Sequence, residues 1–421
     1  MNLFIQDARL PEVPNPVNIV IQDGRIQAIG PQVTPDSPEI TILDAHGLVA
    51  TPGLVNGHTH ASMTLFRGFG DDMPLMQWLQ TRIWPAEAKL TEEDVYWGAR
   101  LACLEMIRSG TVAFEDMYWH FHGMARAVED SGLRAGVGAV MIDVAGPEQG
   151  AACRRLAEET FEASQRYSER VRFTLTPHAI YTVSPESLRW TAEFSQRHDL
   201  PVHIHLSETQ HEVEMCLKNH GVRPAVHLDR QGLLTPRVLL AHGVWLDDDE
   251  LDLIAARGAT LVTNPVSNMK LAVGGVFPFA KAAARNIPIA LGTDGAASNN
   301  TLDLFQEMKF LALIQKHAQH DPTALPSHQV WEVATGAKAP LLGQSGQLTV
   351  GAPADLLLLR HTEPEMTPEH ELISNLVYSA TGHVVDTVIV NGRILMRNRV
   401  IPDEGAIRLE ARDRAIRVCK L

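Results

Sequence analysis

The sequence predicts an α/β protein, namely a (β/α)8 TIM barrel with a small β-sandwich domain built from both termini. Three observations predict this fold. Apolar, strand-like segments alternate with amphipathic, helix-like segments through the middle of the chain, which is typical of a parallel sheet. There are eight such strand-like segments, the number that closes a barrel. The 421 residues exceed the roughly 250 of such a barrel, and both ends of the chain are rich in short strands.

The two ends of the chain carry similar hairpin signals. Asp23-Gly24 near one end and Asn391-Gly392 near the other each separate two apolar segments. Both dipeptides are typical of two-residue turns between paired strands. We therefore expect residues 1–55 and 346–421 to form one composite β-sandwich domain beside a barrel of residues 56–345. Two unrelated β appendages are the alternative.

The predicted barrel strands end in residues that carry chemistry, as expected for a fold whose active sites lie at the carboxyl ends of its strands. The ends lie near His58-Thr59-His60, Glu115-Asp116, Ile142-Asp143, Pro177-His178, His203-Ile204-His205, Ala241-His242, Thr263-Asn264 and Thr293-Asp294. The connection 61–89, after the first strand, is long and holds Phe66, Phe69, Trp78 and Trp84. These rings either line a pocket or take part in ordinary packing.

Helix starts fall between these strands. Thr91 precedes three acids, Ser184 precedes Pro185, and both patterns are typical of an N-cap followed by a first helical turn. The acidic run 247–250 is interpreted in the same way, because acids stabilise the start of a helix. We therefore predict a helix start there and no metal site.

Composition and charge narrow the function classes. The formal net charge is −14, which disfavours nucleic acid as a partner. No apolar run approaches the roughly 18 residues of a membrane span, and no basic flank resembles a secretory signal, so we expect a cytoplasmic protein. The four cysteines are scattered without a C-x-x-C pair, which argues against a disulfide framework or a cysteine zinc cluster. A homo-oligomer stays open.

Three histidines and one aspartate form a candidate metal site. His58 and His60 alternate along an extended segment, so their side chains point to the same side. An H-x-H pair alone is a weak signal, but His205 and Asp294 end later strands of the same barrel. Three nitrogens and one carboxylate leave room for a water and indicate a catalytic site for one divalent metal, with Zn²⁺ as the expected ion. Such a metal lowers the pKa of its bound water to about 7.

Other polar residues are expected around this metal. Glu208 follows His205 by three residues and is placed to act as a general acid or base. His242 ends the next strand and is expected to polarise the water, while Asp294 accepts its proton. His203 lies on the same strand face as His205 but deeper, so we interpret it as a residue behind the ligands or as barrel packing.

The fourth strand lacks a residue that two-metal barrels use. It ends Thr174-Leu175-Thr176-Pro177-His178, with no lysine that could be carboxylated to bridge two ions. The sequence therefore favours one metal. The H-x-E and P-C-x-x-C signature of cytidine-type deaminases is also missing.

Five motifs together resemble the amidohydrolase superfamily, and more closely the 5′-methylthioadenosine/S-adenosylhomocysteine deaminases. They are PGLVNGHTH (52–60), HLSE (205–208), LAH (240–242), NPVSNMKL (264–271) and LGTDGAASNN (291–300). The resemblance covers nearly the whole chain and implies hydrolytic loss of ammonia from C6 of an adenine ring. It also implies that Glu87 binds the ribose hydroxyls, that His178 contacts the substrate and that Glu208 passes a proton to the ring.

One departure from this family bears on the substrate. Members of this family carry an arginine on the third strand that is suited to bind the homocysteine carboxylate, and the matching residue here is Ala139. Arg154 or Arg155 is the candidate for a second such arginine. The departure favours 5′-methylthioadenosine over S-adenosylhomocysteine, with adenosine as a further possible substrate.

Two alternative functions stay open. A relative acting on guanine or a triazine shares much of the pattern, although Glu87 and His178 argue for a ribose. A non-catalytic scaffold is the remote alternative, since such proteins typically lose metal ligands and this chain keeps them.

Overall fold

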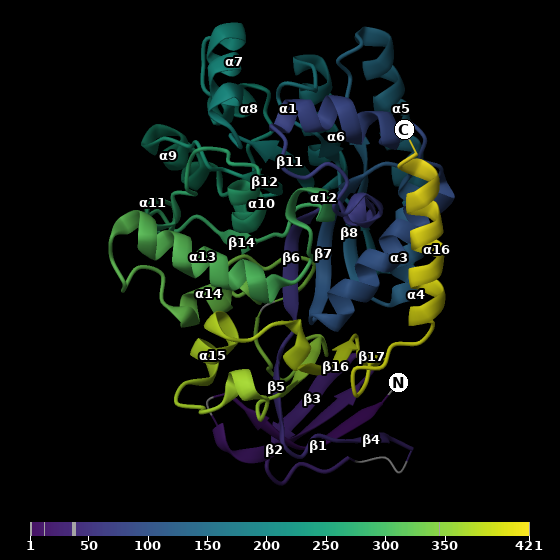
Figure 1. Cartoon of the computed structure of the whole chain (residues 1–421), viewed down its shortest axis with the longest axis vertical. Helices are drawn as coiled ribbons and strands as arrows, with labels where there is room; N and C mark the ends of the chain where they lie inside the picture. Colours follow the sequence, from purple (N-terminus) through teal and green to yellow (C-terminus); the bar gives the residue numbers. More distant parts are fainter. Residues whose placement is uncertain (1, 12, 36–38, 345, 421) are drawn as a thin grey trace.

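The computed structural model describes residues 2–11, 13–35, 39–344 and 346–420. It has two parts, a barrel of strands and helices in the upper part of Figure 1 and a mixed sheet below it. The barrel carries the predicted site residues at the end of its strands that faces away from the mixed sheet.

The barrel strands are parallel and close into a ring. They are β6 (Leu54–Thr59), β7 (Thr111–Tyr118), β8 (Arg134–Met141), β9 (Val171–Phe173), β10 (Thr176–Pro177), β11 (Val202–Leu206), β12 (Val238–His242), β13 (Thr260–Thr263) and β14 (Ile289–Leu291). β9 and β10 share the fourth strand position, both pairing with β8. A parallel bridge between Leu175 and Val202 joins the two arcs of the ring. At the other seam, Asn56 donates to Oγ1 of Thr293 (2.7 Å) and accepts from its backbone N–H (3.1 Å). The predicted barrel is confirmed.

Helices follow the strands around the outside. They are α3 (Glu92–Arg108), α4 (Phe121–Ser131), α5 (Pro147–Ser164), α6 (Pro185–His198), α7 (Gln210–His220), α8 (Pro224–Arg230), α9 (Asp248–Arg257), α10 (Pro265–Lys270), α11 (Phe279–Ala284), α12 (Ala296–Asn299), α13 (Leu304–Gln319) and α14 (Ser327–Ala334). The side chains of Thr91, Ser184 and Asp247 each accept a backbone N–H at the start of α3, α6 and α9. The predicted helix starts are therefore confirmed, including the one formed by the acidic run.

The long connection after β6 folds into four short helices over the mouth of the barrel. They are η1 (Ala61–Phe66), α1 (Leu75–Trp78), η2 (Leu79–Ile83) and α2 (Trp84–Glu87). Its aromatic rings divide between the two expected roles. Phe66 and Phe69 pack in or against the hydrophobic core, whereas Trp78 and Trp84 line a pocket.

Strands from both termini share one mixed sheet. They are β1 (Leu3–Leu10), β2 (Val13–Gln22), β3 (Arg25–Gly30), β4 (Thr41–Asp44), β5 (Leu48–Pro52), β15 (Leu356–Arg360), β16 (Val385–Val390) and β17 (Arg393–Met396), with β5 pairing with β15. Both predicted hairpins form, and all four turn residues have positive φ. The turns also meet, since a Cβ on Gly24 would lie 2.3 Å from Oδ1 of Asn391. The pairing of the two termini is confirmed, and the exact domain boundaries stay a prediction.

The C-terminal part also contains helices that the sequence analysis does not predict. They are η3 (Pro364–Met366), α15 (Leu372–Tyr378), η4 (Gly382–Val384) and α16 (Glu404–Val418). Figure 1 shows α16 running up the side of the barrel beside α3. Arg417 contacts the Asp94 carboxylate at the start of α3, and Arg414 lies 3.7 Å from the same group. Buried Asp94 therefore ties the last helix to the barrel.

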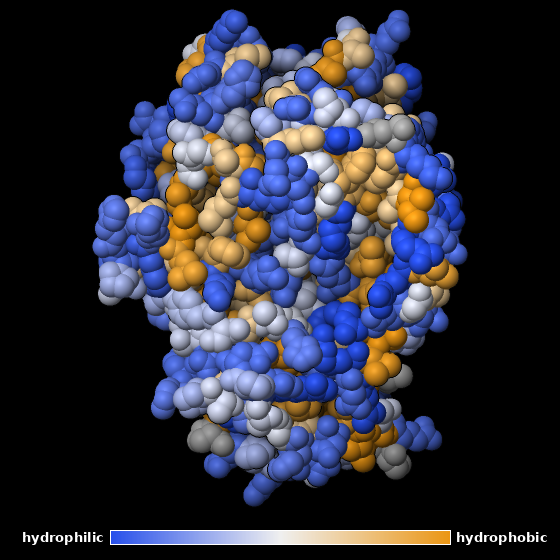
Figure 2. Space-filling view, viewed as in Figure 1, coloured by the Kyte–Doolittle hydropathy of each residue, from blue (hydrophilic) through white to orange (hydrophobic). Residues whose placement is uncertain are grey.

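The surface in Figure 2 is mainly hydrophilic, with apolar patches over α13 and beside α16. No helix among the described residues is long and apolar enough to cross a membrane. All four cysteines are free thiols, as the absence of paired spacing predicts.

Candidate active site

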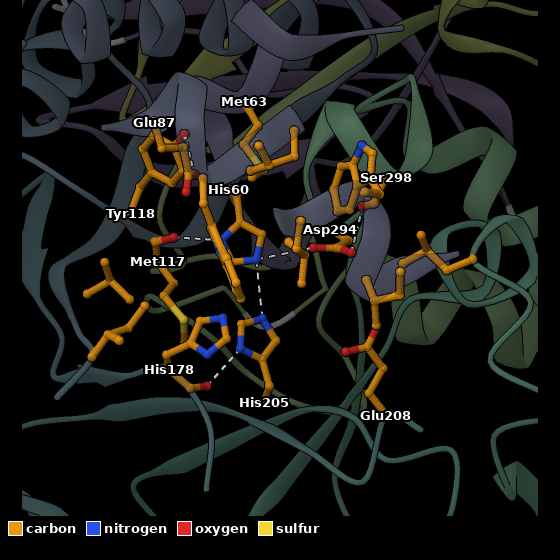
Figure 3. A pocket seen from close by; sticks show the side chains of 18 of the residues that line it. His60, Met63, Glu87, Met117, Tyr118, His178, His205, Glu208, Asp294 and Ser298 are labelled. Carbon is orange, nitrogen blue, oxygen red and sulfur yellow. Dashed lines mark hydrogen bonds and ion pairs between the residues drawn. The ribbon is translucent and has the colours of Figure 1, made fainter. Parts of the chain in front are cut away.

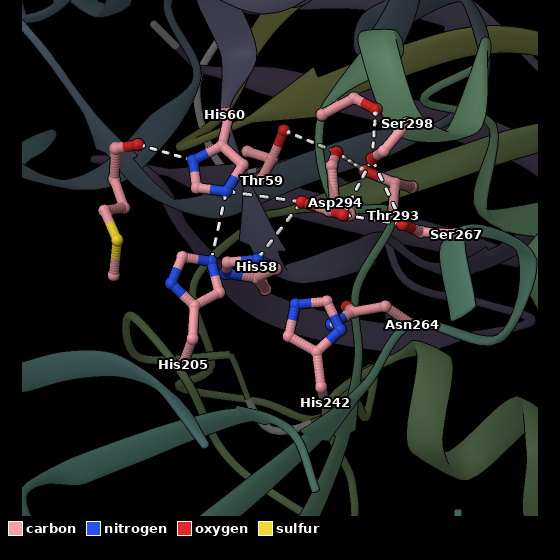
Figure 4. Close-up of polar contacts among 12 residues, drawn as sticks. His58, Thr59, His60, His205, His242, Asn264, Ser267, Thr293, Asp294 and Ser298 are labelled. Carbon is pink, nitrogen blue, oxygen red and sulfur yellow. Dashed lines mark hydrogen bonds and ion pairs between the residues drawn. The ribbon is translucent and has the colours of Figure 1, made fainter. Parts of the chain in front are cut away.

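Three strand ends bring the predicted metal-binding residues to one point (Figure 4). The Nε2 atoms of His60 and His205 are 3.2 Å apart. Oδ1 of Asp294 lies 3.3 Å from Nε2 of both His58 and His60. Donor atoms of His58, His205 and His242 also lie within 4.8 Å of one another. The chain therefore contains a histidine-rich metal site.

Backbone carbonyls fix the ring tautomers of two of these histidines. Nδ1 of His60 lies 2.6 Å from the carbonyl oxygen of Met117, and Nδ1 of His205 lies 2.7 Å from that of His178. A carbonyl only accepts, so each Nδ1 carries a proton and each ring turns its Nε2 toward the site. Two imidazole nitrogens 3.2 Å apart are arranged as two ligands of one cation would be. The arrangement thus fits a metal.

Nε2 of His58 is buried and makes no hydrogen bond with the described residues, although Oδ1 of Asp294 lies 3.3 Å from it. A buried nitrogen without a hydrogen bond is costly unless something else binds its lone pair. Burial lowers the pKa of His58 to about 3, so the ring is neutral. Nδ1 of His58 lies 2.7 Å from Nε2 of His203, which fits the interpretation of His203 as a residue behind the ligands.

The Asp294 carboxylate is held by two serines. Its Oδ2 accepts hydrogen bonds from Oγ of Ser267 (2.6 Å) and Oγ of Ser298 (2.7 Å), which leaves Oδ1 facing the histidines. Burial opposes ionisation of this group, but His58 and His60 hold the pKa of Asp294 well below its ordinary value. The site therefore contains a charged, oriented carboxylate.

Glu208 stands on a loop that a second glutamate holds in place. Oε1 of Glu212 accepts the backbone N–H of Ser207 and Oε2 accepts that of Glu208, each at 2.9 Å. Glu212 lies in the first turn of α7, where Thr209 is the N-cap. Burial raises the pKa of Glu208 above its ordinary value, which favours a protonated carboxyl near the metal site.

His242 lies between Glu208 and the metal-site residues. Its Nδ1 is 2.8 Å from Oδ1 of Asn268 and 4.0 Å from Oε1 of Glu208. Burial alone would lower its pKa, but the carboxylates of Glu208 and Asp294 raise it above the ordinary value. His242 is therefore suited to hold a proton beside the site.

Three residues of the site have left-handed backbone. The φ angles of Ser207, His242 and Asp294 are 49°, 73° and 61°. Residues other than glycine rarely adopt this region, and it costs about 1–3 kcal/mol unless the surroundings impose it. Each of the three lies at or after the end of a barrel strand at the active face. Their unusual backbone conformation therefore sets the direction in which the side chains of the site point.

A pocket of about 750 Å³ opens above the metal site. In the view of Figure 3, Glu87 and Glu208 lie on opposite sides of it, with His60, His205 and Asp294 between them. Oε1 of Glu87 accepts a hydrogen bond from the Tyr118 hydroxyl at 2.9 Å, and burial raises the pKa of Glu87 to about 7.

The fourth strand position contributes His178 to the same pocket. Its Nδ1 lies 2.8 Å from Oγ1 of Thr182, and burial lowers its pKa to about 3. The ring is therefore neutral. The structure thus brings together all the site residues that the sequence predicts.

Comparison with known proteins identifies the family. The model of the amidohydrolase family matches residues 49–395, which is most of the chain. The chain belongs to the amidohydrolase family. This amidohydrolase is 49% identical over 383 residues to the 5′-deoxyadenosine deaminase of Methanoregula boonei, covering 90% of this chain and 86% of the relative. It is 45% identical over 392 residues to the 5-methylthioadenosine/S-adenosylhomocysteine deaminase of Syntrophobacter fumaroxidans, covering 91% and 89%.

A solved structure agrees with the architecture of this amidohydrolase. An adenosine deaminase from Xanthomonas campestris with bound zinc aligns with a TM-score of 0.89 and 33% identity, covering 100% of this chain and 99% of the other. The resemblance inferred from the motifs is therefore confirmed at the level of the family.

Sequence reasoning misses several residues that hold this amidohydrolase site together. Ser267, Ser298 and Asn268 lie inside motifs already recognised, yet no residue spacing reveals which ligand they contact. Glu212 follows Glu208 by four residues, and that spacing is the one local signal that points to its role.

Proposed function

We propose that 5′-methylthioadenosine is the substrate of this enzyme, a hydrolytic deaminase of adenine nucleosides. The observation that carries the proposal is a single pocket with the metal site at its base, buried Glu208 on one side and partly buried Glu87 on the other (Figure 3). Glu208 is suited to contact the adenine base, and Glu87 is suited to accept hydrogen bonds from the ribose hydroxyls. The product would be 5′-methylthioinosine, with ammonia released.

His58, His60, His205 and Asp294 would hold one divalent metal, which we assign as Zn²⁺. The support is the converging Nε2 atoms of His60 and His205, and Oδ1 of Asp294, which lies 3.3 Å from Nε2 of both His58 and His60. When bound there, the ion supplies a water acidic enough to act as a nucleophile at neutral pH.

The chain's own residues would move the protons of the reaction. The C–O bond forms at C6 of adenine and the bond from C6 to the amino group breaks. Glu208 would donate a proton to the ring nitrogen beside C6, where charge builds as the water adds. His242 and Asp294 would orient the water, and Asp294 would accept its proton. The departing amine collects that proton and leaves as ammonia.

The ribose is assigned to the opposite wall of the pocket. Glu87 would accept hydrogen bonds from the ribose hydroxyls, and the neutral ring of His178 would contact the nucleoside beside it. Neither guanine nor a triazine has groups that need Glu87, so this wall argues against those substrates. A non-catalytic scaffold would not need a buried, neutral His58 whose Nε2 makes no hydrogen bond.

The substituent at the 5′ position distinguishes the remaining candidates. The names of the curated relatives favour two of them besides 5′-methylthioadenosine, namely 5′-deoxyadenosine and S-adenosylhomocysteine. Arg154, a candidate for the homocysteine carboxylate, instead pairs with Glu186 (2.9 Å) and Ser187 (2.9 Å). Neither Arg154 nor Arg155 lines the pocket, so the charged tail lacks its expected partner. A cytoplasmic location and a homo-oligomer stay predictions.

The test is ammonia release, with the accompanying ultraviolet shift, from zinc-loaded protein. The panel is 5′-methylthioadenosine, 5′-deoxyadenosine, S-adenosylhomocysteine, adenosine, adenine and guanine. We expect the highest kcat/KM on 5′-methylthioadenosine. Activity on guanine alone, or on none of the panel, would overturn the nucleoside assignment.

A further inference from the structure

A second hollow continues the active-site pocket outward. This outer groove is lined along α5 by Leu156 and Glu159, by Arg166 just beyond the end of that helix, and by Val144 in the loop before it. It encloses about 2340 Å³ of space open to solvent. Seven residues line both hollows, namely Leu79, Trp84, Glu87, Trp119, Ile142, His178 and Tyr181. The groove is therefore continuous with the pocket at the wall assigned to the ribose.

The outer groove is apolar where it meets the pocket. Val144 is 67% exposed and Leu156 is 47% exposed, although both are large aliphatic side chains. Met76, Trp84 and Tyr181 are further exposed apolar residues that line it. Water-exposed apolar side chains grouped along one groove are typical of a site for an apolar ligand.

The charges of the outer groove do not suit a carboxylate. Among the described residues that line it, Arg166 is the one arginine, and it is joined by the carboxylates of Glu92 and Glu159. Arg166 is exposed, lies two residues beyond the end of α5 and is not among the residues that the groove shares with the pocket. The seven shared residues at the ribose wall are mainly apolar and include no arginine or lysine.

The orientation of the substrate points its 5′ end into this groove. This step rests on the proposed function, in which C6 of adenine faces the metal site and the ribose hydroxyls face Glu87. The deep end of the pocket is then filled by the base. The 5′ carbon lies beyond the ribose, and the shared wall of Glu87, His178 and Tyr181 opens there into the outer groove.

We propose that the outer groove binds the 5′ substituent and selects apolar 5′-thioethers, including alkyl and aryl groups much larger than methyl. A methylthio group fills little of the available space. Each further methylene that the groove buries raises binding by up to about fourfold. The homocysteine tail adds only two methylenes and then ends in a charged carboxylate, which would lie in a groove whose lining includes the carboxylates of Glu92 and Glu159.

The test compares kcat/KM across nucleosides that differ only at the 5′ position. The series is 5′-deoxyadenosine, 5′-methylthioadenosine, 5′-butylthioadenosine, 5′-benzylthioadenosine and S-adenosylhomocysteine. We expect kcat/KM on the butylthio compound at least equal to that on the methylthio compound, and at least about tenfold above that on S-adenosylhomocysteine. A sharp fall beyond methylthio, or a preference for S-adenosylhomocysteine, would overturn the inference.

A charged substitution tests the place of the subsite. Leu156→Glu should lower the ratio of kcat/KM for butylthioadenosine to that for 5′-deoxyadenosine by about tenfold or more. Leu217→Glu is the matched control, because Leu217 is 44% exposed on α7 and lines neither hollow, and it should leave the ratio unchanged. An unchanged ratio in Leu156→Glu would place the 5′ substituent elsewhere.

Two outcomes separate this inference from its premises. If the wild type deaminates 5′-methylthioadenosine best but gains nothing from larger apolar 5′ groups, the inference is wrong and the proposed function stands. If no adenine nucleoside is deaminated, the proposed function itself fails.

If Leu156→Glu lowers activity on all nucleosides equally and halves the mass measured by light scattering, the groove is an interface between copies of the chain and the inference is overturned.

Discussion

The inner pocket and the outer groove are built by opposite means, although they meet at the same wall. In the inner pocket, most polar groups are buried and several are held by defined partners, as with the two serines on Asp294. In the outer groove, Val144 and Leu156 are aliphatic and face solvent. Buried, hydrogen-bonded groups are placed to a fraction of an ångström, as chemistry requires. Exposed apolar walls tolerate ligands of different size, so the comparison separates a precise region from a permissive one.

The largest expected effect would come from removing the proposed proton donor of the inner pocket. Glu208→Gln keeps the size of the side chain but cannot donate a carboxyl proton, so we expect kcat to fall by about 10²–10⁴-fold. Metal content, measured by atomic emission on the purified variant, should be unchanged. Loss of metal as well would show that Glu208 is a ligand.

The wall shared by the two regions should give the next effect. Glu87→Ala removes a charged acceptor for the ribose hydroxyls, and such hydrogen bonds contribute about 1.5–3 kcal/mol. We expect KM for nucleosides to rise by about 10–150-fold. The affinity for free adenine, measured as a competitive inhibition constant, should change little. An equal loss for adenine would remove the ribose assignment.

A smaller effect tests whether the precision of the inner pocket depends on residues that touch no substrate. Glu212→Gln retains one acceptor oxygen for two backbone N–H groups, so the loop of Glu208 loses a hydrogen bond. We expect kcat to fall by about fivefold, since one net hydrogen bond contributes about 1 kcal/mol, with KM nearly unchanged. Exposed Glu214 on the same helix provides the control variant Glu214→Gln. A rise in KM at constant kcat would argue against a positioning role for Glu212.

The smallest effect is a pH dependence at the shared wall. The pKa of Glu87 is about 7, raised by burial, so the carboxylate that accepts ribose hydroxyls is lost as pH falls through 7. We expect KM for 5′-methylthioadenosine to rise on going from pH 8 to pH 6, relative to the inhibition constant of adenine. A constant ratio of the two would contradict the assignment.

The same group makes folding sensitive to pH in the opposite direction. Its folded pKa is raised from 4.5 to about 7, so its contribution to stability is present below 4.5 and is lost as pH rises through 7. Glu87→Gln should therefore raise Tm at pH 8 more than at pH 5, which thermal melts at the two values would measure.

Much of this molecule follows from local sequence signals. The hairpins at Asp23-Gly24 and Asn391-Gly392 and the helix starts at Thr91 and Asp247 depend on neighbouring residues alone, so sequence reasoning finds them. The alternation of His58 and His60 likewise places both rings on one side of a strand. These signals need no knowledge of how the barrel closes.

Contacts between distant segments could not be predicted in this way. The hydrogen bond from His60 to the carbonyl of Met117 depends on how two strands are staggered, and a backbone carbonyl leaves no trace in sequence. The role of Ser267 depends on how α10, which follows β13, meets the segment that follows the neighbouring strand β14. α16 is not predicted because both of its sides are largely polar. Its position depends on a contact with Asp94, which lies on another helix.

The attachment of α16 reaches the end of the connection that covers the mouth of the barrel. Arg417 holds the Asp94 carboxylate that also caps α3, and Lys89 donates to the backbone carbonyl of Lys420 (2.5 Å). Lys89 lies two residues after Glu87, at the end of that connection. One ion pair and one hydrogen bond therefore fasten the last helix to residues that directly follow the segment carrying Glu87.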